Sequence, residues 1–203
     1  MKNNTIITIS RQYGSGGRLI GQKLAERLGI PFYDKELITL AAEESGFAEH
    51  LFEKNDRNIT NSLLYSLSMY GNTMGLYDMP LNDKLFIAQS KTIQSVAEKG
   101  PCVIVGRCAD YVLRNKPNVL NVFIHSDMES KVRRVVEDYG VESDNVVELI
   151  NKTDKRRANY YNYYTGHNWG EMRRYDLTLN SSITGIEGAV ELIAALVRIR
   201  GMQ

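Results

Sequence analysis

The segment TIITISRQYGSGGRLIGQKLAERLG, residues 5–29, limits the fold more than any other part of the chain. An apolar run rich in β-branched residues leads into a glycine-rich turn, and the turn leads directly into an amphipathic helical pattern. Glycines at 14, 16 and 17 permit a tight turn, let a ligand approach the main chain, and leave N–H groups to point inward. The following helix adds partial positive charge at its N-terminus. The segment therefore predicts a strand–loop–helix unit that binds phosphate.

The loop departs from the pattern G-x-x-x-x-G-K-[ST], which describes many phosphate-binding loops. When Gly17 and Arg18 are aligned with Gly-Lys, Gln12 stands at the first glycine and Leu19 stands at the Ser/Thr. Arg18 still supplies a planar cation that can bind phosphate. A glycine-rich turn without a ligand is the alternative interpretation. We expect phosphate contacts from the turn and the helix start, which comprise Gly14, Ser15, Gly16, Gly17, Arg18 and Leu19.

The missing Ser/Thr matters for metal binding, because that hydroxyl is a Mg²⁺ ligand in the full pattern. Leu19 has no oxygen, and the nearest hydroxyls belong to Ser10 and Ser15. Mg²⁺ dehydrates reluctantly and usually keeps several waters. We therefore expect Mg²⁺ to be held through phosphate and water without direct side-chain ligation, with Ser15 as the candidate exception. The two cysteines and three histidines are too scattered to predict a metal centre or a disulfide framework.

Short apolar runs alternate with helical patterns along most of the chain. The clearest runs lie at 5–10, 102–106, 120–125 and 175–180, and PFYD at 31–34 is a weaker one. Nearly continuous apolar runs suit parallel strands that are buried on both faces. Strands that alternate with helices predict an α/β fold built on a parallel sheet. Helices are expected over 17–29, 34–45, 83–100, 127–140, 141–166 and 185–200.

The length of 203 residues suits one domain with small inserts. Residues 46–82 are polar, rich in Asn and interspersed with Met and Tyr, so we interpret them as helical pieces and loops inserted into the core. A net charge of +1 creates no global field toward nucleic acid or membrane. No signal peptide is visible, and no apolar run approaches the ~18 residues that span a bilayer. The sequence predicts a soluble cytoplasmic protein that binds small molecules, and it does not indicate an oligomeric state.

Three charged residues are candidates for the acceptor side of a site. Arg107 follows the run VIVG and is expected at the carboxyl end of a buried strand, where open α/β sheets bind ligands. Its guanidinium would either bind two oxygens of an acceptor phosphate or form a structural salt bridge. Asp34 ends the run at 31–34 and would either contact the acceptor or cap the next helix. Arg57, the only arginine of the 46–82 insert, is a candidate phosphate contact.

The segment TDKRRANYYNYY is basic and aromatic. On a helix, Asp154 and Arg157 lie three residues apart on one side. The cluster would either bind polyphosphate or form a solvated basic face, and the register leaves Arg156 and Arg157 as competing candidates. We expect half of the tyrosines that follow to pack the helix against the core, with stacking on a base as the alternative; they stand at 160, 161, 163 and 164.

Three segments resemble the cytidylate-kinase-like proteins, a divergent branch of the nucleoside monophosphate kinases. Residues 7–38, ITISRQYGSGGRLIGQKLAERLGIPFYDKELI, resemble the opening of these proteins, and the altered loop is part of the branch pattern. Residues 102–113, CVIVGRCADYVL, are similar to the segment in which Gly-Arg-Asp follows the third strand. Residues 149–182 are similar to the lid and the last strand. The resemblance covers essentially the whole chain in the same order and spacing.

The resemblance implies a P-loop NTPase core with a five-stranded parallel sheet flanked by helices. This single domain, 1–203, would carry an acceptor-binding insert and helices over 35–100 and a lid over 150–174. The reaction would be γ-phosphoryl transfer from ATP, with Mg²⁺, to CMP or dCMP. The catalytic residues would be Arg18, Asp154 and Arg156 or Arg157. The acceptor-binding residues would be Asp34, Arg57, Arg107 and Asp110.

Two departures from cytidylate kinase itself leave other functions open. That enzyme has a lysine and a hydroxyl residue in the loop, where this chain has Arg18 and Leu19. The aspartate after Gly-Arg is replaced by Cys108, and Asp110 lies two residues further on. The alternatives are a kinase for another small-molecule acceptor and a nucleotide-binding regulator without catalysis.

Overall fold

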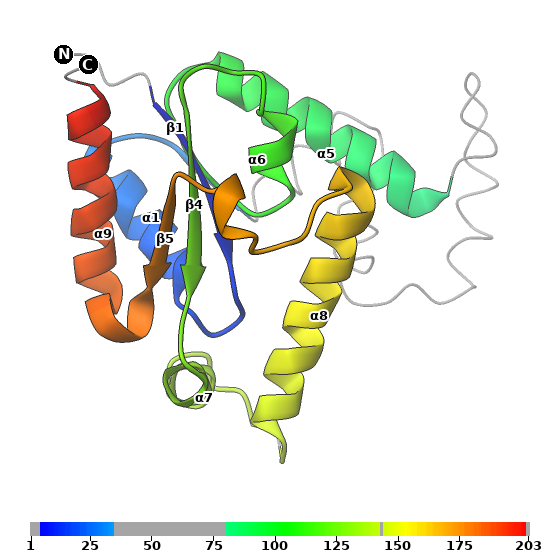
Figure 1. Ribbon diagram of the computed structural model, residues 1–203, viewed down its shortest axis with the longest axis vertical. Helices are drawn as coiled ribbons and strands as arrows, with labels where there is room; N and C mark the ends of the chain where they lie inside the picture. Colours follow the sequence, from blue (N-terminus) through cyan, green and yellow to red (C-terminus); the bar gives the residue numbers. More distant parts are fainter. Residues whose placement is uncertain (1–4, 35–79, 143, 202–203) are drawn as a thin grey trace.

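The computed structural model describes residues 5–34, 80–142 and 144–201. A parallel sheet of five strands lies at its centre (Figure 1). The strands are β1 (Ile6–Arg11), β2 (Phe32–Tyr33), β3 (Val103–Val105), β4 (Val119–His125) and β5 (Leu177–Asn180). Their order is β2-β3-β1-β4-β5, so the first strand in the sequence lies in the middle of the sheet. The predicted α/β class and all five predicted strand runs are confirmed.

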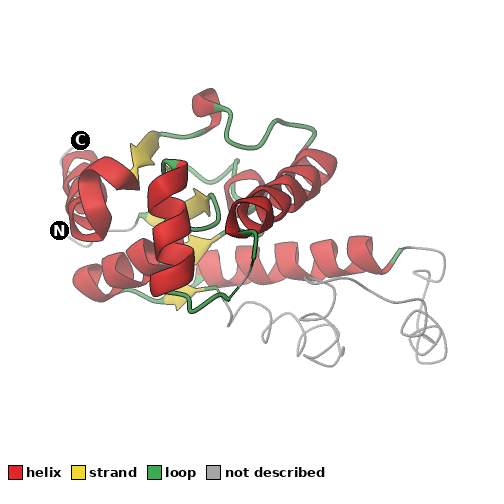
Figure 2. Ribbon diagram, turned by 90° about the horizontal axis from the view of Figure 1, so that it is seen from below, coloured by secondary structure: helices red, strands yellow, loops and turns green. Residues whose placement is uncertain are grey.

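Helices cover both faces of this sheet, as Figure 2 shows from below. They are α1 (Gly17–Leu28), α5 (Leu81–Glu98), α6 (Ala109–Val112), α7 (Met128–Glu137), α8 (Val146–Thr165), the 3-10 turn η1 (Met172–Arg174) and α9 (Ser181–Arg200). Ile7 and Ile9 of β1 belong to a core shared with α1 and α9. Ile6 belongs to the opposite core, which α5 and α6 close. The alternation of side chains along a strand therefore explains why β1 is apolar throughout.

The predicted helices are present within the described ranges, with some shifted ends. α1 ends at Gly29, whose left-handed φ of 64° closes the helix as predicted. Asp127 caps α7 as predicted, because its side chain accepts an N–H from the first turn. α9 opens with a short turn from Ser181, which Asn180 caps, and its regular helix follows a kink at Gly185, where φ is 65° and ψ is −176°. The predicted start at residue 185 therefore matches the regular part of α9. The helix predicted over 34–45 lies outside the described residues beyond its first position.

The glycine-rich turn leaves the sheet at the carboxyl end of β1, the edge at which parallel α/β sheets bind ligands. α7 and α8 contact each other and lie at this end of the sheet (Figure 1). The predicted lid over 150–174 corresponds to most of α8 and to η1. Of the predicted acceptor region, residues 35–79 lie outside the described ranges. Within those ranges, no helix has both the length and the apolar character needed to cross a membrane.

Candidate active site

The glycine-rich turn forms a tightly bonded loop between β1 and α1. Ser15 is fully buried; its hydroxyl donates to the Gln12 carbonyl at 2.8 Å, and its own carbonyl accepts from the Ser181 hydroxyl at 2.7 Å. Gly14 and Gly16 have left-handed φ angles of 76° and 75°. Other residues would be strained in this conformation. The loop therefore offers main-chain N–H groups, and not side chains, to a ligand.

Helix α7 packs directly against this loop at Gly14. A Cβ atom at Gly14 would lie 3.0 Å from both Cβ and the carbonyl oxygen of Lys131. One turn further along α7, Arg134 donates from Nη1 to the Gly14 carbonyl at 2.5 Å. Lys131 and Arg134 thus flank the loop, although the sequence pattern did not single them out. Their i, i+3 spacing on the helix after β4 is the signal that points to them.

A half-buried carboxylate, that of Asp154, connects the loop, α7 and α8. Oδ1 of Asp154 accepts the main-chain N–H of Tyr13 at 2.6 Å, and Oδ2 lies 3.3 Å from Nζ of Lys131. The Lys131 side chain is 6% exposed, so water screens this ion pair weakly. A main-chain N–H and an ammonium group converge on one anion here. The same two donor types bind phosphate oxygens in other proteins.

The two adjacent arginines of α8 point in different directions. Arg157 is half-buried, donates to the Arg11 carbonyl at 3.0 Å, and places its guanidinium carbon 5.5 Å from the ring centroid of Tyr13. Arg156 is exposed to solvent. Neighbouring residues on an α-helix are rotated by about 100°. Arg157 therefore faces the phosphate loop, and Arg156 does not.

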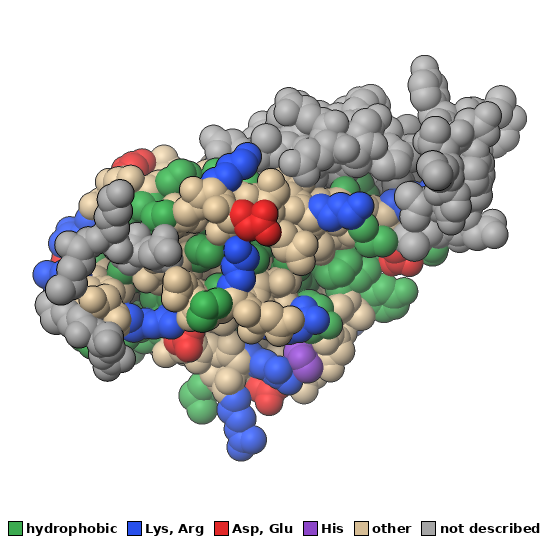
Figure 3. Space-filling model, turned by 90° about the horizontal axis from the view of Figure 1, so that it is seen from above, with side chains coloured by type: hydrophobic (Ala, Val, Ile, Leu, Met, Phe, Trp, Pro, Cys, Tyr) green, Lys and Arg blue, Asp and Glu red, His purple; other side chains and the backbone are tan. Residues whose placement is uncertain are grey.

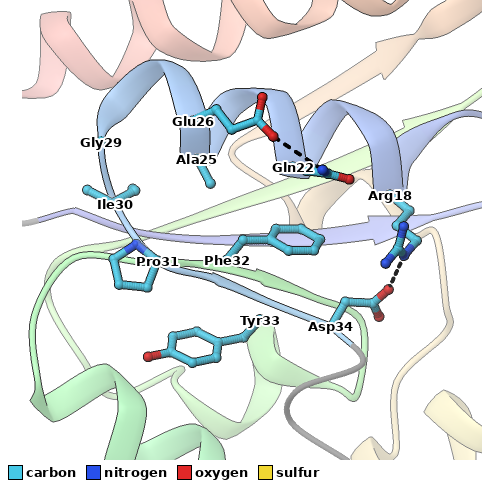
Figure 4. Close-up of a pocket in the computed structure, with 10 residues that line it drawn as sticks. All are labelled: Arg18, Gln22, Ala25, Glu26, Gly29, Ile30, Pro31, Phe32, Tyr33 and Asp34. Carbon is cyan, nitrogen blue, oxygen red and sulfur yellow. Dashed lines mark hydrogen bonds and ion pairs between the residues drawn. The ribbon is translucent and has the colours of Figure 1, made fainter.

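Arg18 lies on the other flank of the loop, at the start of α1 (Figure 4). Its Nε donates to Oδ2 of Asp34 at 2.6 Å, while the side chain stays 56% exposed. Nη2 of Arg11 lies 3.9 Å from the other carboxylate oxygen of Asp34. Leu19, the next residue of α1, is exposed. The structure thus brings together Arg18, predicted for the donor, and Asp34, predicted for the acceptor.

An open groove of about 620 Å³ lies between α1 and β2 (Figure 4). Arg18 and Asp34 line one end of it, and the ring of Phe32, a residue of β2, lies below α1 in this view. The other end of the groove lies at Gly29 and Pro31. The full length of α1 separates it from the glycine-rich loop. Only the Arg18 end of the groove can therefore contribute to phosphate chemistry.

The backbone is strained at the carboxyl end of β3. Arg107 and Cys108 have φ angles of 60° and 55°, the only positive values for non-glycine residues within the described ranges. Each costs about 1–2 kcal/mol, and such strain is concentrated at functional sites. The N–H of Gly106 donates to the Ile9 carbonyl at 2.9 Å, so this strand end lies beside the end of β1. Arg107 therefore lies at the carboxyl end of β3, as the sequence predicted.

The neighbours of Arg107 are buried. Burial raises the pKa of the Cys108 thiol to about 12, so this cysteine is a neutral core residue. Asp110 is also buried, and its Oδ2 accepts the hydroxyl of Tyr161 at 2.7 Å. Burial raises the pKa of the Asp110 carboxyl, and the Tyr161 hydrogen bond offsets part of this effect. The structure therefore places Asp110 under α8 and not at an open acceptor surface. Arg57, the other predicted acceptor contact, lies outside the described residues.

The tyrosines of α8 mostly anchor this helix to the core. The hydroxyls of Tyr160, Tyr161 and Tyr164 each donate to a side chain of α5 or α6. Tyr164 also stacks on Phe86 of α5, with ring centroids 4.2 Å apart. Tyr163 is 73% exposed, and its ring meets the edge of the Tyr164 ring with centroids 4.9 Å apart. The packing interpretation is confirmed for three of the four tyrosines.

The residues around the loop fit a magnesium ion that is held through phosphate and water. The Ser15 hydroxyl is directed inward, to the Gln12 carbonyl, and the carboxylates of Asp34 and Asp154 already pair with cationic side chains. No group of three or more His, Cys, Asp or Glu residues in the described parts of the chain could hold a metal ion alone. Direct ligation by Ser15 would require that this hydroxyl give up its bond inside the loop.

The gathering of cations at the loop is local. Figure 3 views the molecule from above, and on that face lysine and arginine side chains are interspersed with acidic and uncharged ones. Around the loop, Arg134 and Arg157 donate to the carbonyls of Gly14 and Arg11 from two helices. Lys131 lies beside them and pairs with Asp154. Such an arrangement can bind a polyanion and stabilise charge that develops on it.

Comparison with known proteins gives a consistent family assignment. Residues 6–183 match the model of the cytidylate kinase-like family. A curated relative, the cytidylate kinase of Ignicoccus hospitalis (strain KIN4/I), is 23% identical over 193 residues, which cover 95% of this chain and 99% of the relative.

Solved structures share the fold across nearly the whole chain. An uncharacterized protein from Eubacterium ventriosum ATCC 27560 superposes with a TM-score of 0.69 at 30% identity, covering 96% of this chain and 98% of that one. Shikimate kinase from Bacteroides thetaiotaomicron superposes with a TM-score of 0.55 at 18% identity, with the same coverage. The predicted P-loop kinase core is therefore confirmed.

Proposed function

The chain belongs to the cytidylate kinase-like family, and on this premise we propose that it transfers the γ-phosphoryl group of ATP to CMP or dCMP. The observation that supports this most directly is the set of three cations around the glycine-rich loop. Arg134 of α7 donates to the Gly14 carbonyl, and Arg157 of α8 donates to the Arg11 carbonyl just before the loop. Lys131 of α7 is tied to the loop through Asp154, which also accepts the Tyr13 N–H. Phosphoryl transfer needs mainly positioning and charge stabilisation, which is what such a set supplies.

On the donor side, main-chain N–H groups of the loop and the N-terminus of α1 bind the phosphates of ATP. The Lys131 ammonium has three N–H donors and gives one to Asp154, so it can also donate to a phosphate oxygen, whereas the single Tyr13 N–H is already donated to Asp154. Asp154 then holds Lys131 at the loop and does not itself exchange protons with the substrate. Arg18 can add a contact once its guanidinium moves from Asp34.

During transfer, an oxygen of the acceptor phosphate attacks the γ-phosphorus while the bond to the bridging oxygen of ADP breaks. The products are ADP and the nucleoside diphosphate, so no proton or electron has to be supplied by the protein. Arg157 faces the loop and offsets the negative charge on the transferred group. This assigns the arginine of the lid to Arg157 in preference to Arg156. Mg²⁺ bound through phosphate oxygens and water would supply additional charge neutralisation.

On the acceptor side, Arg107 is the proposed contact to the monophosphate. It is half-buried at the carboxyl end of β3, beside the end of β1, in a strained conformation that a ligand-binding role would explain. Asp34 lies at the end of β2, next to Arg18, on the same edge of the sheet. We assign Asp34 to the same acceptor region, where it also keeps Arg18 in place.

A different small-molecule acceptor is the second candidate. One observation favours it: the aspartate that follows Gly-Arg in cytidylate kinase is replaced by Cys108, which is buried and neutral. An acceptor contact from that position is therefore absent. The donor half of the site would act in the same way with either acceptor.

The test is product identification by mass spectrometry after incubation with ATP and Mg²⁺. CMP and dCMP would be offered together with a pool of phosphate-free hydroxyl acceptors, including hydroxy acids and sugar acids. The proposal expects CDP or dCDP to form, and Arg157→Ala to reduce the product strongly while Arg156→Ala does not. Exclusive phosphorylation of a phosphate-free acceptor would instead establish the second candidate.

A further inference from the structure

A buried hydrogen bond links the helix that bears Arg157 to the strand end that bears Arg107. The Tyr161 hydroxyl donates to Oδ2 of Asp110 at 2.7 Å. The two residues are 4% and 7% exposed, so water does not compete for this bond. Asp110 is on α6, three residues after Arg107, and Tyr161 is on α8, four residues after Arg157.

On α8, the position of Tyr161 and the position of Arg157 are coupled, because the two residues are four apart. Residues i and i+4 lie on one face of a helix, so Tyr161 and Arg157 share a face of α8. Arg157 reaches the carbonyl of Arg11 at the start of the phosphate loop, and Tyr161 reaches α6. A rotation or slide of α8 that broke the Tyr161 bond would also displace the Arg157 guanidinium from the loop.

The same bond also links α8 to Arg107 on the acceptor side, because Asp110 is only three residues after Arg107. α6 begins directly after Arg107 and Cys108, whose left-handed φ angles set the direction in which the chain leaves β3. Asp110 is in the first turn of this four-residue helix. Attachment of Asp110 to α8 therefore fixes the short segment that carries Arg107 as well.

Burying the polar groups of Asp110 and Tyr161 costs more free energy than an apolar contact at the same place would. Oδ1 of Asp110 is buried and has no hydrogen-bond partner of normal geometry within the described structure. An apolar pair of similar size would avoid the cost of burying these polar groups. A directional hydrogen bond, unlike an apolar contact, defines one register of α8 against α6.

We infer that Asp110 and Tyr161 are positioning residues, which hold Arg157 of α8 and Arg107 of the β3 end in register across the proposed active site. This inference rests on the proposed kinase function. It predicts that their effect on turnover passes through Arg157. It also gives Asp110 a different task from the acceptor contact that its position in the sequence suggests.

The test compares Tyr161→Phe with Tyr163→Phe, the same change on an exposed tyrosine of the same helix. Tyr161→Phe is expected to lower kcat about tenfold while the KM for ATP stays within about twofold, because a displaced Arg157 acts mainly on the transition state. Tyr163→Phe is expected to leave both constants unchanged. Asp110→Asn keeps an acceptor oxygen for Tyr161 and should retain most of the activity that Asp110→Ala loses.

A mutant cycle with Arg157→Ala separates positioning from a general loss of folded protein. In the Arg157→Ala background, Tyr161→Phe should lower kcat by no more than about twofold, because the group that it positions is already gone. A tenfold loss in both backgrounds would overturn the inference. So would a Tyr161→Phe enzyme with wild-type kcat.

Hydrogen exchange of the ligand-free proteins gives a result that does not depend on turnover. Tyr161→Phe should speed amide exchange in α8 around Arg157 and in α6, and Tyr163→Phe should not. Unchanged exchange in Tyr161→Phe would contradict the inference. If the wild-type protein phosphorylates no acceptor, the proposed function fails, and hydrogen exchange still decides whether this bond holds α8 in register.

Discussion

The carboxylate of Asp154 joins the Tyr13 N–H, at 2.6 Å, to the Lys131 ammonium, at 3.3 Å. Tyr13 is part of the glycine-rich loop, Lys131 is on α7, and Asp154 is on α8, so one anion holds three segments together. Both side chains of the ion pair are largely buried, at 6% and 16% exposure. Removal of either partner leaves a poorly solvated charge, which gives this contact a measurable effect on stability.

Asp154→Ala should therefore destabilise the protein by about 2–4 kcal/mol in urea denaturation at neutral pH. The matched control is Glu148→Ala, which breaks the ion pair with Lys152 on the same helix. That pair is exposed on both sides, so its loss should cost less than about 1 kcal/mol. Equal effects of the two substitutions would show that the Asp154 pair is solvated in solution.

Gly14→Ala tests whether the shape of the loop is needed for nucleotide binding. Gly14 and Gly29 both have left-handed φ angles, so alanine at either position costs about 1–2 kcal/mol of strain. Only at Gly14 would the new Cβ also meet Lys131, whereas nothing lies within 4 Å of a Cβ at Gly29. We expect calorimetry to show at least about tenfold weaker ATP binding for Gly14→Ala and unchanged binding for Gly29→Ala. Retained ATP affinity in Gly14→Ala would place the nucleotide elsewhere.

Arg157→Ala and Arg156→Ala form a second matched pair, on adjacent positions of one helix. Loss of Arg157 should lower kcat about 10²- to 10³-fold, because its charge faces the loop and acts on the transferred phosphoryl group. Loss of the exposed Arg156 should change kcat by less than about threefold. Steady-state kinetics with ATP and the best acceptor checks both values. The reverse order of effects would mean that α8 turns when substrate binds.

The buried carboxyl of Asp110 should make stability depend on pH in a defined direction. Its pKa is raised above the ordinary value of about 3.9, so the folded protein keeps a proton that the unfolded chain has already lost. This contribution to stability is complete below that ordinary value and is lost as pH rises through the raised pKa. Asp110→Asn should therefore gain stability relative to the wild type as pH rises above about 4, and urea denaturation at a series of pH values checks this.

Asp127→Asn is the control for the pH dependence of Asp110, because the pKa of Asp127 is shifted in the opposite direction. The pKa of Asp127 is lowered, chiefly by a hydrogen bond from Ser182 and by the main-chain N–H of Ser130. Ionised Asp127 stabilises the folded protein above the ordinary carboxyl pKa, and this stabilisation is lost as pH falls through the lowered pKa. Parallel pH profiles for the two variants would contradict the environments described for these carboxyls.

Much of the fold could be predicted from local sequence signals. The runs of β1, β3 and β4 were recognisable because parallel strands buried on both faces require continuous apolar sequence. The runs of β2 and β5 were weaker signals, because these strands are only partly buried. Gly29 and Asp127 mark helix ends through their own backbone or side-chain preferences, which depend little on distant contacts. The glycine-rich turn was recognisable for the same reason.

The composition of the site could be predicted only in part, because it depends on how distant helices pack. Lys131 and Arg134 face the loop only because α7 packs on Gly14, a contact between residues far apart in sequence. The choice between Arg156 and Arg157 depends on a rotation of α8 by a single residue, which the sequence does not specify. The burial of Asp110 depends on Tyr161, 51 residues away.

A coupled ADP-release assay with ATP, Mg²⁺ and a panel of CMP, dCMP, UMP, AMP and GMP tests the proposed phosphoryl transfer most simply. We expect kcat/KM to be highest for CMP or dCMP, and Arg157→Ala to remove most of this activity. ADP release that no monophosphate raises above the rate with ATP alone, from a protein that still binds ATP, would contradict this proposal.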